Sequence, residues 1–261
     1  MRKSSNKIVS FAAFALSSIC AHAQPPLVTG DVPTAEPGHF EWSLGSIYQK
    51  SGGLERQLPA SEFVYGLNER SELSLETPYL NADGERGFGD ITLGTKVVLL
   101  PENPGRPGLS GSYEWKLNNG SVTRGLGSGG HEHGFLLRSQ KTFGWFTPIV
   151  NLGYTIVPDV QISGVRETRR NTWKASCAQE WRVSEKTAFL TELYWQQADR
   201  AHEQDRLAWN AGVRYRIHED LELRFAAGKS VRSESAGGPD LRVYVGVQWA
   251  FAAPWSNKSK L

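Results

Sequence analysis

Charged side chains recur at alternate positions in several segments of the sequence whose other positions are apolar. Carboxylates and cations in this arrangement could pair with one another, bind a charged solute, or set the charge selectivity of a polar passage. The residues that we expect to line such a passage are Glu72, Glu76, Lys96, Glu114, Lys116, Arg138, Lys174, Glu192, Arg214, Arg224 and Arg242. The alternative is that they form ion pairs that only fill and rigidify an interior. Such pairs need good hydrogen bonding to offset desolvation, and water in a passage relaxes that demand.

A few other polar residues are of the types found in metal or catalytic sites. His131 and His133 flank Glu132, and histidines at positions i and i+2 of a strand point to the same face, where they could hold a metal. We find no obvious third ligand, so we expect no metal and no cofactor. Ser128, His131 and Asn151 are residue types of a lipid hydrolase. Their spacing does not bring them together and Gly-x-Ser-x-Gly is absent, so we assign no catalytic residue and expect no enzyme.

The segment from Leu241 to Phe251 shows most clearly which element must position the charged residues. Its odd-numbered positions are all apolar, whereas its even-numbered positions are mostly small or polar and include Arg242. Side chains on a strand point alternately to opposite faces, so one face of this strand is apolar. An Arg or Lys that faces lipid at mid-bilayer costs about 2–4 kcal/mol. We therefore expect the apolar face to contact lipid and the charged face to enclose water.

Similar segments, each of about ten residues, recur along the chain; a tilted strand of that length crosses the hydrocarbon layer. No segment after the N-terminus approaches the ~20 consecutive apolar residues that a membrane-spanning helix needs. The expected strands are 38–50, 54–66, 70–80, 88–100, 108–119, 132–142, 144–156, 171–181, 185–196, 206–217, 220–229 and 240–251. The sequence thus predicts an all-β fold, a transmembrane antiparallel up-and-down β-barrel of about 12 strands over residues 38–251.

The connections between these segments fall into two sets. Every second connection is short, and most of these are tight turns; they lie at 68–69, 101–108, 143–144, 183–184 and 218–219. The other connections are longer on average, at 81–87, 119–130, 158–170, 198–205 and 230–239, with a short exception around 51–53. Short turns at one end and long loops at the other are typical of outer-membrane barrels, whereas a soluble β-sandwich would not sort its loops in this way.

The two ends of the chain differ from the strand-like part. Residues 1–23 combine a basic start, a short apolar run and a small-x-small site, as a cleaved signal peptide does. We expect residues 24–37 to form an N-terminal periplasmic or plug segment and residues 252–261 to form a polar C-terminal tail. Barrels of this kind often end on an aromatic residue, which serves as an assembly signal, so the tail after Phe251 is a departure from that pattern.

Bulk composition excludes several classes of protein. The formal net charge is +2 over 261 residues, and no basic block indicates nucleic-acid binding. Cys177 is the only cysteine after the predicted signal peptide, so the mature chain can form neither an internal disulfide nor a metal site built on thiolates.

Short motifs spread over most of the mature chain point to a family. The most specific motif, Gly87–Lys96, reads Gly-Phe-Gly-Asp-Ile-Thr-Leu-Gly-Thr-Lys and is similar to the pattern GxGDxxLGxK. The other matching pieces are 26–31, 63–67, 75–80, 125–130 and 151–154. In their order and spacing the chain resembles a family of outer-membrane proteins associated with the meta-cleavage pathway of phenol degradation and described as transporters. The resemblance implies a barrel that passes small, often aromatic or hydrophobic, compounds.

These features together predict a channel or transporter for small molecules, aromatic or hydrophobic ones among them, in the outer membrane of a Gram-negative bacterium. The expected partners are membrane lipid, a small-molecule solute and the outer-membrane assembly machinery, but no nucleic acid. Two alternatives stay open. A lipid-modifying enzyme would depend on Ser128 and His131, and a structural or adhesive barrel would bind partners through its extracellular loops, chiefly 158–170.

Overall fold

The computed structural model describes residues 26–51, 53–82, 84–162, 165–200, 203–231 and 241–255. The predicted signal peptide, residues 1–23, lies outside the described residues, as does the end of the predicted tail from residue 256 onward. No helix in the described ranges is long and apolar enough to cross a membrane.

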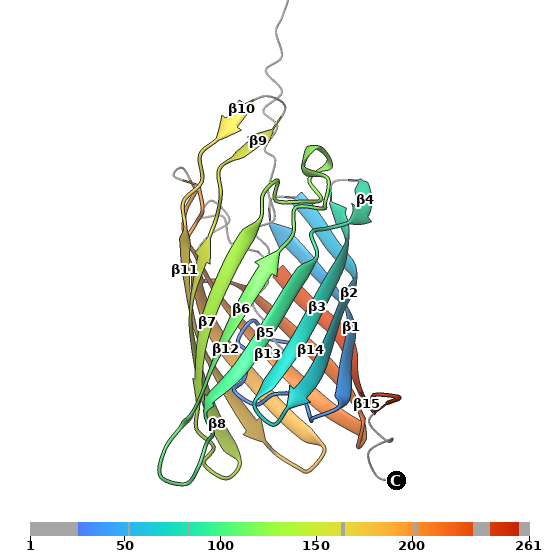
Figure 1. Cartoon of the computed structure of the whole chain (residues 1–261), viewed down its shortest axis with the longest axis vertical. Coiled ribbons are helices and arrows are strands. Elements are labelled where there is room, and N and C mark those ends of the chain that lie inside the picture. The colour runs from blue at the N-terminus through green and yellow to red at the C-terminus, as the bar shows by residue number, and fades with distance from the viewer. Residues whose placement is uncertain are drawn as a thin grey trace, which may run out of the picture.

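Within the described residues, twelve antiparallel strands close into a barrel (Figure 1). They are β1 (His39–Ser51), β2 (Gly53–Asn68), β3 (Ser71–Ala82), β5 (Thr92–Leu100), β6 (Gly108–Lys116), β7 (Glu132–Gln140), β8 (Phe146–Ile156), β11 (Thr172–Arg182), β12 (Thr187–Gln196), β13 (Arg206–His218), β14 (Leu221–Ser230) and β15 (Leu241–Ala252). Each of these strands pairs with the next along the chain, and β15 pairs with β1 to close the ring. The predicted all-β, twelve-stranded, up-and-down barrel is confirmed.

Shorter elements occur in the longer connections. They are β4 (Glu85–Phe88), the 3-10 turn η1 (Val122–Arg124), β9 (Val160–Ile162) and β10 (Val165–Glu167). The hairpin of β9 and β10 projects beyond one end of the barrel, and β4 lies at the same end (Figure 1). The sequence prediction had treated these stretches as plain loops, or in the case of Phe88 as the start of a barrel strand.

The predicted start of one barrel strand and the predicted end of the next are both wrong, and the hydrogen bonds of Asp90 explain both differences. The barrel strand expected to begin at residue 88 begins at Thr92, and the strand expected to run to residue 119 ends at Lys116. The Asp90 carboxylate accepts hydrogen bonds from the backbone N–H groups of Asn119 and Gly120 at 3.2 and 2.7 Å. These bonds hold both chain segments in a loop, so neither segment continues the ladder.

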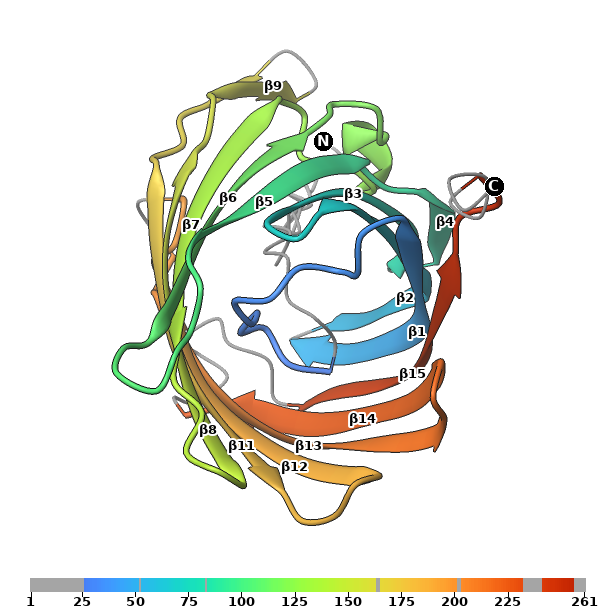
Figure 2. The ribbon, with the colours of Figure 1, turned by 60° about the horizontal axis from the view of Figure 1, so that its bottom comes forward.

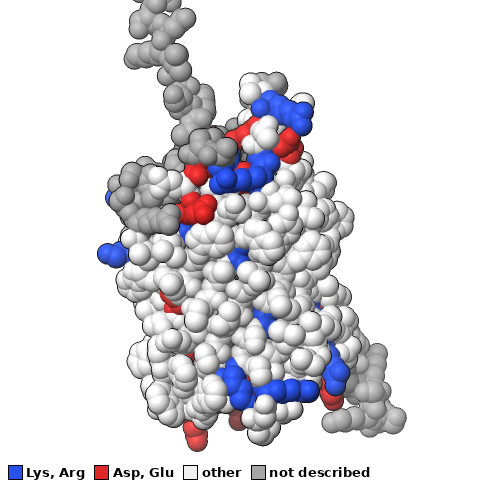
Figure 3. Space-filling model, turned by 90° about the vertical axis from the view of Figure 1, so that its left-hand side faces the viewer, with Lys and Arg blue, Asp and Glu red and all other residues white. Residues whose placement is uncertain are grey.

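The predicted alternation of faces is visible in side-chain exposure. On β15 the side chain of Val245 is 55% exposed, whereas Tyr244 beside it is buried. On β8 Val150 and Leu152 are about half exposed, whereas Asn151 between them is buried. Figure 3 shows that the charged side chains on one side of the barrel gather mainly near its two ends, with a mostly uncharged band between them. Such a band is what a strand barrel presents to the hydrocarbon layer of a membrane.

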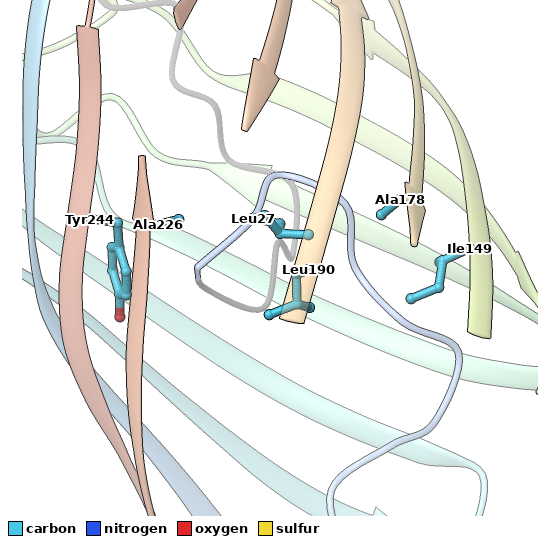
Figure 4. Close-up of a cluster of buried hydrophobic side chains, with 6 residues drawn as sticks. All are labelled: Leu27, Ile149, Ala178, Leu190, Ala226 and Tyr244. Carbon is cyan, nitrogen blue, oxygen red and sulfur yellow. The ribbon is translucent and has the colours of Figure 1, made fainter. Parts of the chain in front are cut away.

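Residues 26–38 do not belong to the wall but lie inside the ring of strands, as Figure 2 shows. Leu27 of this segment belongs to a buried apolar cluster that also includes Leu190 and Tyr244 of the wall (Figure 4). Farther along the segment, Pro37 forms an isolated bridge with Gly66 of β2. A Cβ atom at Gly66 would lie 2.1 Å from the backbone oxygen of Glu36, so only glycine permits this close approach.

The outward position of Val245, near the middle of β15, provides a test of the lipid-facing surface. Val245→Arg should lower the free energy of unfolding in lipid vesicles by about 2–4 kcal/mol, because the guanidinium would face hydrocarbon. Urea denaturation followed by tryptophan fluorescence would measure the change, with Val245→Leu as the matched control. An arginine variant as stable as the control would show that this face of the barrel does not contact lipid.

Candidate functional site

Strand register places the predicted passage residues on the inner face of the barrel. Glu72 on β3 lies opposite Lys96 on β5, and Arg214 on β13 lies opposite Arg224 on β14, so each pair shares a face. The buried members of the set are Glu72, Lys96, Glu114, Lys116, Arg138, Glu192, Arg224 and Arg242, and the half-buried members are Glu76, Lys174 and Arg214. That these residues set selectivity remains a prediction.

Carboxylates of the wall hold the N-terminal segment inside the lumen. The Glu192 carboxylate accepts hydrogen bonds from the backbone N–H groups of Val28 at 2.9 Å and Thr29 at 2.8 Å. The Thr29 hydroxyl also donates to Glu192 at 2.8 Å, and the side-chain amide of Asn210 donates to the same carboxylate. Hydrogen bonds to a charged group contribute about 1.5–3 kcal/mol each. Glu192 is therefore the main polar anchor for the start of the described segment.

Further contacts fix the segment along its length. The N–H of Val32 donates to Gln140 Oε1 at 2.9 Å, and the N–H of Ala35 donates to Glu72 Oε2 at 2.7 Å. The Nζ of Lys96 lies 3.0 Å from Glu72 and 3.7 Å from Asp31 of the segment. Because these partners lie on β3, β5 and β7, whereas Glu192 is on β12, the segment is held between different parts of the wall.

A second buried network lies where β6 and β7 meet the longer loops. Lys116 Nζ is 2.6 Å from Glu132, and Glu132 is 3.1 Å from the guanidinium of Arg169. Arg169 also pairs with Asp199. In the same group of loops, a hydrogen bond from the Arg169 backbone N–H is the main cause that lowers the pKa of Asp159. These ion pairs tie two loops to the wall and rigidify this end of the barrel.

Two more of the predicted charges, Arg214 and Arg224, form ion pairs on another part of the wall. Arg214 forms an ion pair with Glu180 of β11, and the guanidinium of Arg224 lies 2.7 Å from Glu222. Gln248 on β15 donates a hydrogen bond to Glu41 on β1. Each of these two arginines therefore has a carboxylate partner on the inner wall, which offsets part of the cost of burying its charge.

Sequence reasoning missed several residues of the site. Arg169, Asp199 and Glu132 were not predicted as a network, since the first two lie in loops whose positions depend on the whole fold. Asp31 and Gln140 were also missed as contacts between the segment and the wall. The available signal was weak: residues 26–31 matched a family motif although they form no strand.

The residue types considered for catalysis are not brought together. The Ser128 hydroxyl is buried and donates a hydrogen bond to Asp90 at 2.8 Å. The His131 ring instead contacts Trp115, and Trp115 lies on the outer face because its neighbours on β6 face inward. Asn151 faces inward on β8, five residues before Ile156, which pairs with His133. At about 3.3 Å per residue, Asn151 therefore lies about 17 Å along β8 from the residue that pairs with His133, away from Ser128 and His131.

Both histidines contact other side chains of the protein. His133 points outward, and its Nδ1 lies 2.8 Å from the hydroxyl of Tyr113, with which it forms a hydrogen bond. In the portion of the chain that the structure describes, no three His, Cys, Asp or Glu residues are grouped so that they could hold a metal ion.

Comparisons with known proteins agree with this architecture. The model of a family described as "Putative MetA-pathway of phenol degradation" matches residues 40–240, which confirms the resemblance found in the sequence motifs. No curated protein matches the chain.

Several solved structures share the fold. An outer membrane channel from Pseudomonas putida F1 has a TM-score of 0.69 at 13% sequence identity, covering 85% of this chain and 98% of that chain. The NanC porin has a TM-score of 0.57 at 12% identity, covering 80% and 98%. The KdgM porin has a TM-score of 0.56 at 12% identity, covering 80% and 99%. At these identities the likeness shows the barrel fold alone.

The anchoring role of Glu192 can be tested by hydrogen exchange. Glu192→Gln should increase the exchange of the Val28 and Thr29 amides about tenfold, because neutral acceptors bind N–H groups about half as strongly as a carboxylate does. Hydrogen–deuterium exchange with mass spectrometry would measure the protection of residues 26–35. The control is Glu180→Gln, which removes a lumen carboxylate that pairs with Arg214 instead. Equal exchange in the two variants would contradict the anchor.

Proposed function

We propose that this chain, which belongs to the phenol-degradation family whose model spans residues 40–240, is an outer-membrane channel for small molecules that its own N-terminal segment obstructs. The observation that carries the proposal is the position of residues 26–38, inside a barrel whose inner wall is charged and whose outer wall is apolar. The fold shared with an outer membrane channel and with porins supports it.

The distribution of side chains supports a membrane location and a wet interior. Apolar residues such as Val245 and Leu152 are exposed on the outer face, where contact with water would be unfavourable and contact with acyl chains is not. Ionised residues such as Lys96 and Glu72 lie on the inner face, where water and neighbouring charges can solvate them. A predicted signal peptide at residues 1–23 would take the chain across the inner membrane, and outer-membrane assembly machinery would then insert it among its lipid partners.

The contacts of the N-terminal segment are of a kind that can be broken and reformed. The backbone of Val28 and Thr29 bonds to side chains of the wall, and Leu27 packs in a small apolar cluster. The segment joins β1 through Gly38, whose φ of 75° is accessible to glycine without strain. In this proposal residues 26–36 move as a unit while the bridge between Pro37 and Gly66 stays in place, and a passage between the polar walls opens when they do.

The solute class and the selectivity residues are part of the same proposal. The family's association with phenol degradation favours small aromatic or hydrophobic compounds. The inward charges from Glu72 to Arg242 named above would set which of these compounds pass, because fixed charges on a passage wall attract or repel charged solutes. No residue is given a catalytic role.

A reversible crosslink provides the test of obstruction. The side-chain oxygens of Thr29 and Ser176 are 2.9 Å apart, so cysteines at both positions lie close enough to form a disulfide. Thr29→Cys combined with Ser176→Cys should give a refolded protein with almost no conductance in a planar bilayer when oxidised. Reduction should restore conductance, because the segment is then free to leave the lumen.

The native Cys177, whose side chain is exposed, is replaced by serine in this protein and in the control, which carries Cys177→Ser alone. The control should conduct equally with and without reductant. An oxidised double-cysteine protein that conducts as well as its reduced form would exclude the segment as the obstruction.

A further inference from the structure

A small cavity lies in the lumen between the N-terminal segment and the wall formed by β8, β11 and β12. Val28 of the segment lines one side. The wall contributes two adjacent rows of inward residues, in register across the three strands. One row consists of Asn151, Ser176 and Tyr194, and the next consists of Gly153, Lys174 and Gln196.

The polar groups that line this cavity have spare hydrogen-bonding capacity. Asn151 and Tyr194 are each only 3% exposed, yet among the described residues neither the Asn151 amide nor the Tyr194 hydroxyl has a hydrogen-bond partner. A buried polar group without a partner costs about 1–3 kcal/mol. Because these side chains line the cavity, a bound polar group there could satisfy them.

The charge of the cavity is positive. Lys174 extends over Gly153, where a Cβ atom would lie 2.5 Å from the Lys174 Cε atom. Within the described ranges no ion pair involves Lys174. The carboxylate of Glu192 lies on β12 in the row next to that of Ser176 and Tyr194 and two rows from Lys174, and it is already bonded to Val28, Thr29 and Asn210. An ammonium, an amide N–H and a phenol hydroxyl are all donors, so the cavity suits an anion with two acceptor oxygens.

The size of the cavity limits what can bind. Its space for water-sized groups is about 30 Å³, and one water needs about 10–15 Å³ by that measure. Two oxygen-sized groups therefore fit, as in a carboxylate. The surrounding hollow, including the part open to solvent, amounts to about 460 Å³ and is lined by the apolar side chains of Val28 and Leu136. A small apolar body attached to the carboxylate could lie there.

We propose that this cavity binds the carboxylate group of a small carboxylic acid, with Lys174 as the cation and Asn151 and Tyr194 as hydrogen-bond donors. This binding site specifies a class of solute for the proposed channel, so the proposal rests on the channel function. Because Val28 forms part of the cavity, an acid bound there also contacts the segment that obstructs the lumen. Occupancy of the site and position of the segment are therefore coupled.

Titration calorimetry on the full folded protein in detergent tests the site, with benzoate as the probe and benzamide as its neutral analogue. The protein should bind benzoate at least tenfold more tightly than benzamide. Lys174→Met should weaken benzoate binding at least tenfold, whereas Lys174→Arg should retain most of it. Arg216→Met is the matched control, since it removes an inward cation of β13 outside the cavity and should leave benzoate binding unchanged.

Equal affinities for benzoate and benzamide, or a Lys174→Met protein that binds benzoate like the unaltered chain, would overturn the site. Bilayer recordings in potassium chloride separate this result from the channel function. A protein that conducts but does not bind benzoate would overturn the carboxylate site alone. A protein that binds benzoate through Lys174 but never conducts would overturn the channel and leave the site standing.

Discussion

The structure depends on one constraint, the pairing of backbone hydrogen-bond groups in a closed antiparallel ladder. In hydrocarbon an unpaired N–H or C=O group has no water to bind, so a sheet can cross a membrane only when its two edges meet. Here the edges meet where β1 pairs with β15, from His39 opposite Ala252 to Lys50 opposite Leu241. Closure makes an inside and an outside, and strand alternation then assigns each side chain to one of them.

The same closure explains why so many ionised groups can be buried. Lys96 and Glu72 would be costly in a dry core, but a barrel lumen lets each carboxylate reach a cation, a backbone N–H or water. Glu192 and Glu72 both bond to backbone N–H groups of residues 26–38. The lumen charges thus do more than balance one another, because they give a chain segment without secondary structure a defined position.

The lumen carboxylates thus both balance nearby charges and hold residues 26–38, and the way they hold this segment bears on function. A segment held by a regular strand ladder would be a permanent part of the wall, whereas one held by side-chain acceptors and a small apolar cluster around Leu27 can be displaced by competing interactions. The cavity lined by Val28 lies between this segment and the wall, where the Asn151 amide of β8 and the Tyr194 hydroxyl of β12 lack hydrogen-bond partners among the described residues. The proposed obstruction of the lumen and the proposed carboxylate site therefore share Val28.

The sequence by itself determined the barrel, the approximate strand positions and the face of each strand residue, because alternation is a local property with a period of two residues. It could not determine that β5 begins only at Thr92, after the loop that Asp90 holds, since the groups that Asp90 binds lie about 30 residues away, at Asn119 and Gly120. Nor could it decide which inward charges meet. Glu192 and Val28 are 164 positions apart, and only closure of the barrel around residues 26–38 brings that carboxylate and that N–H within 2.9 Å.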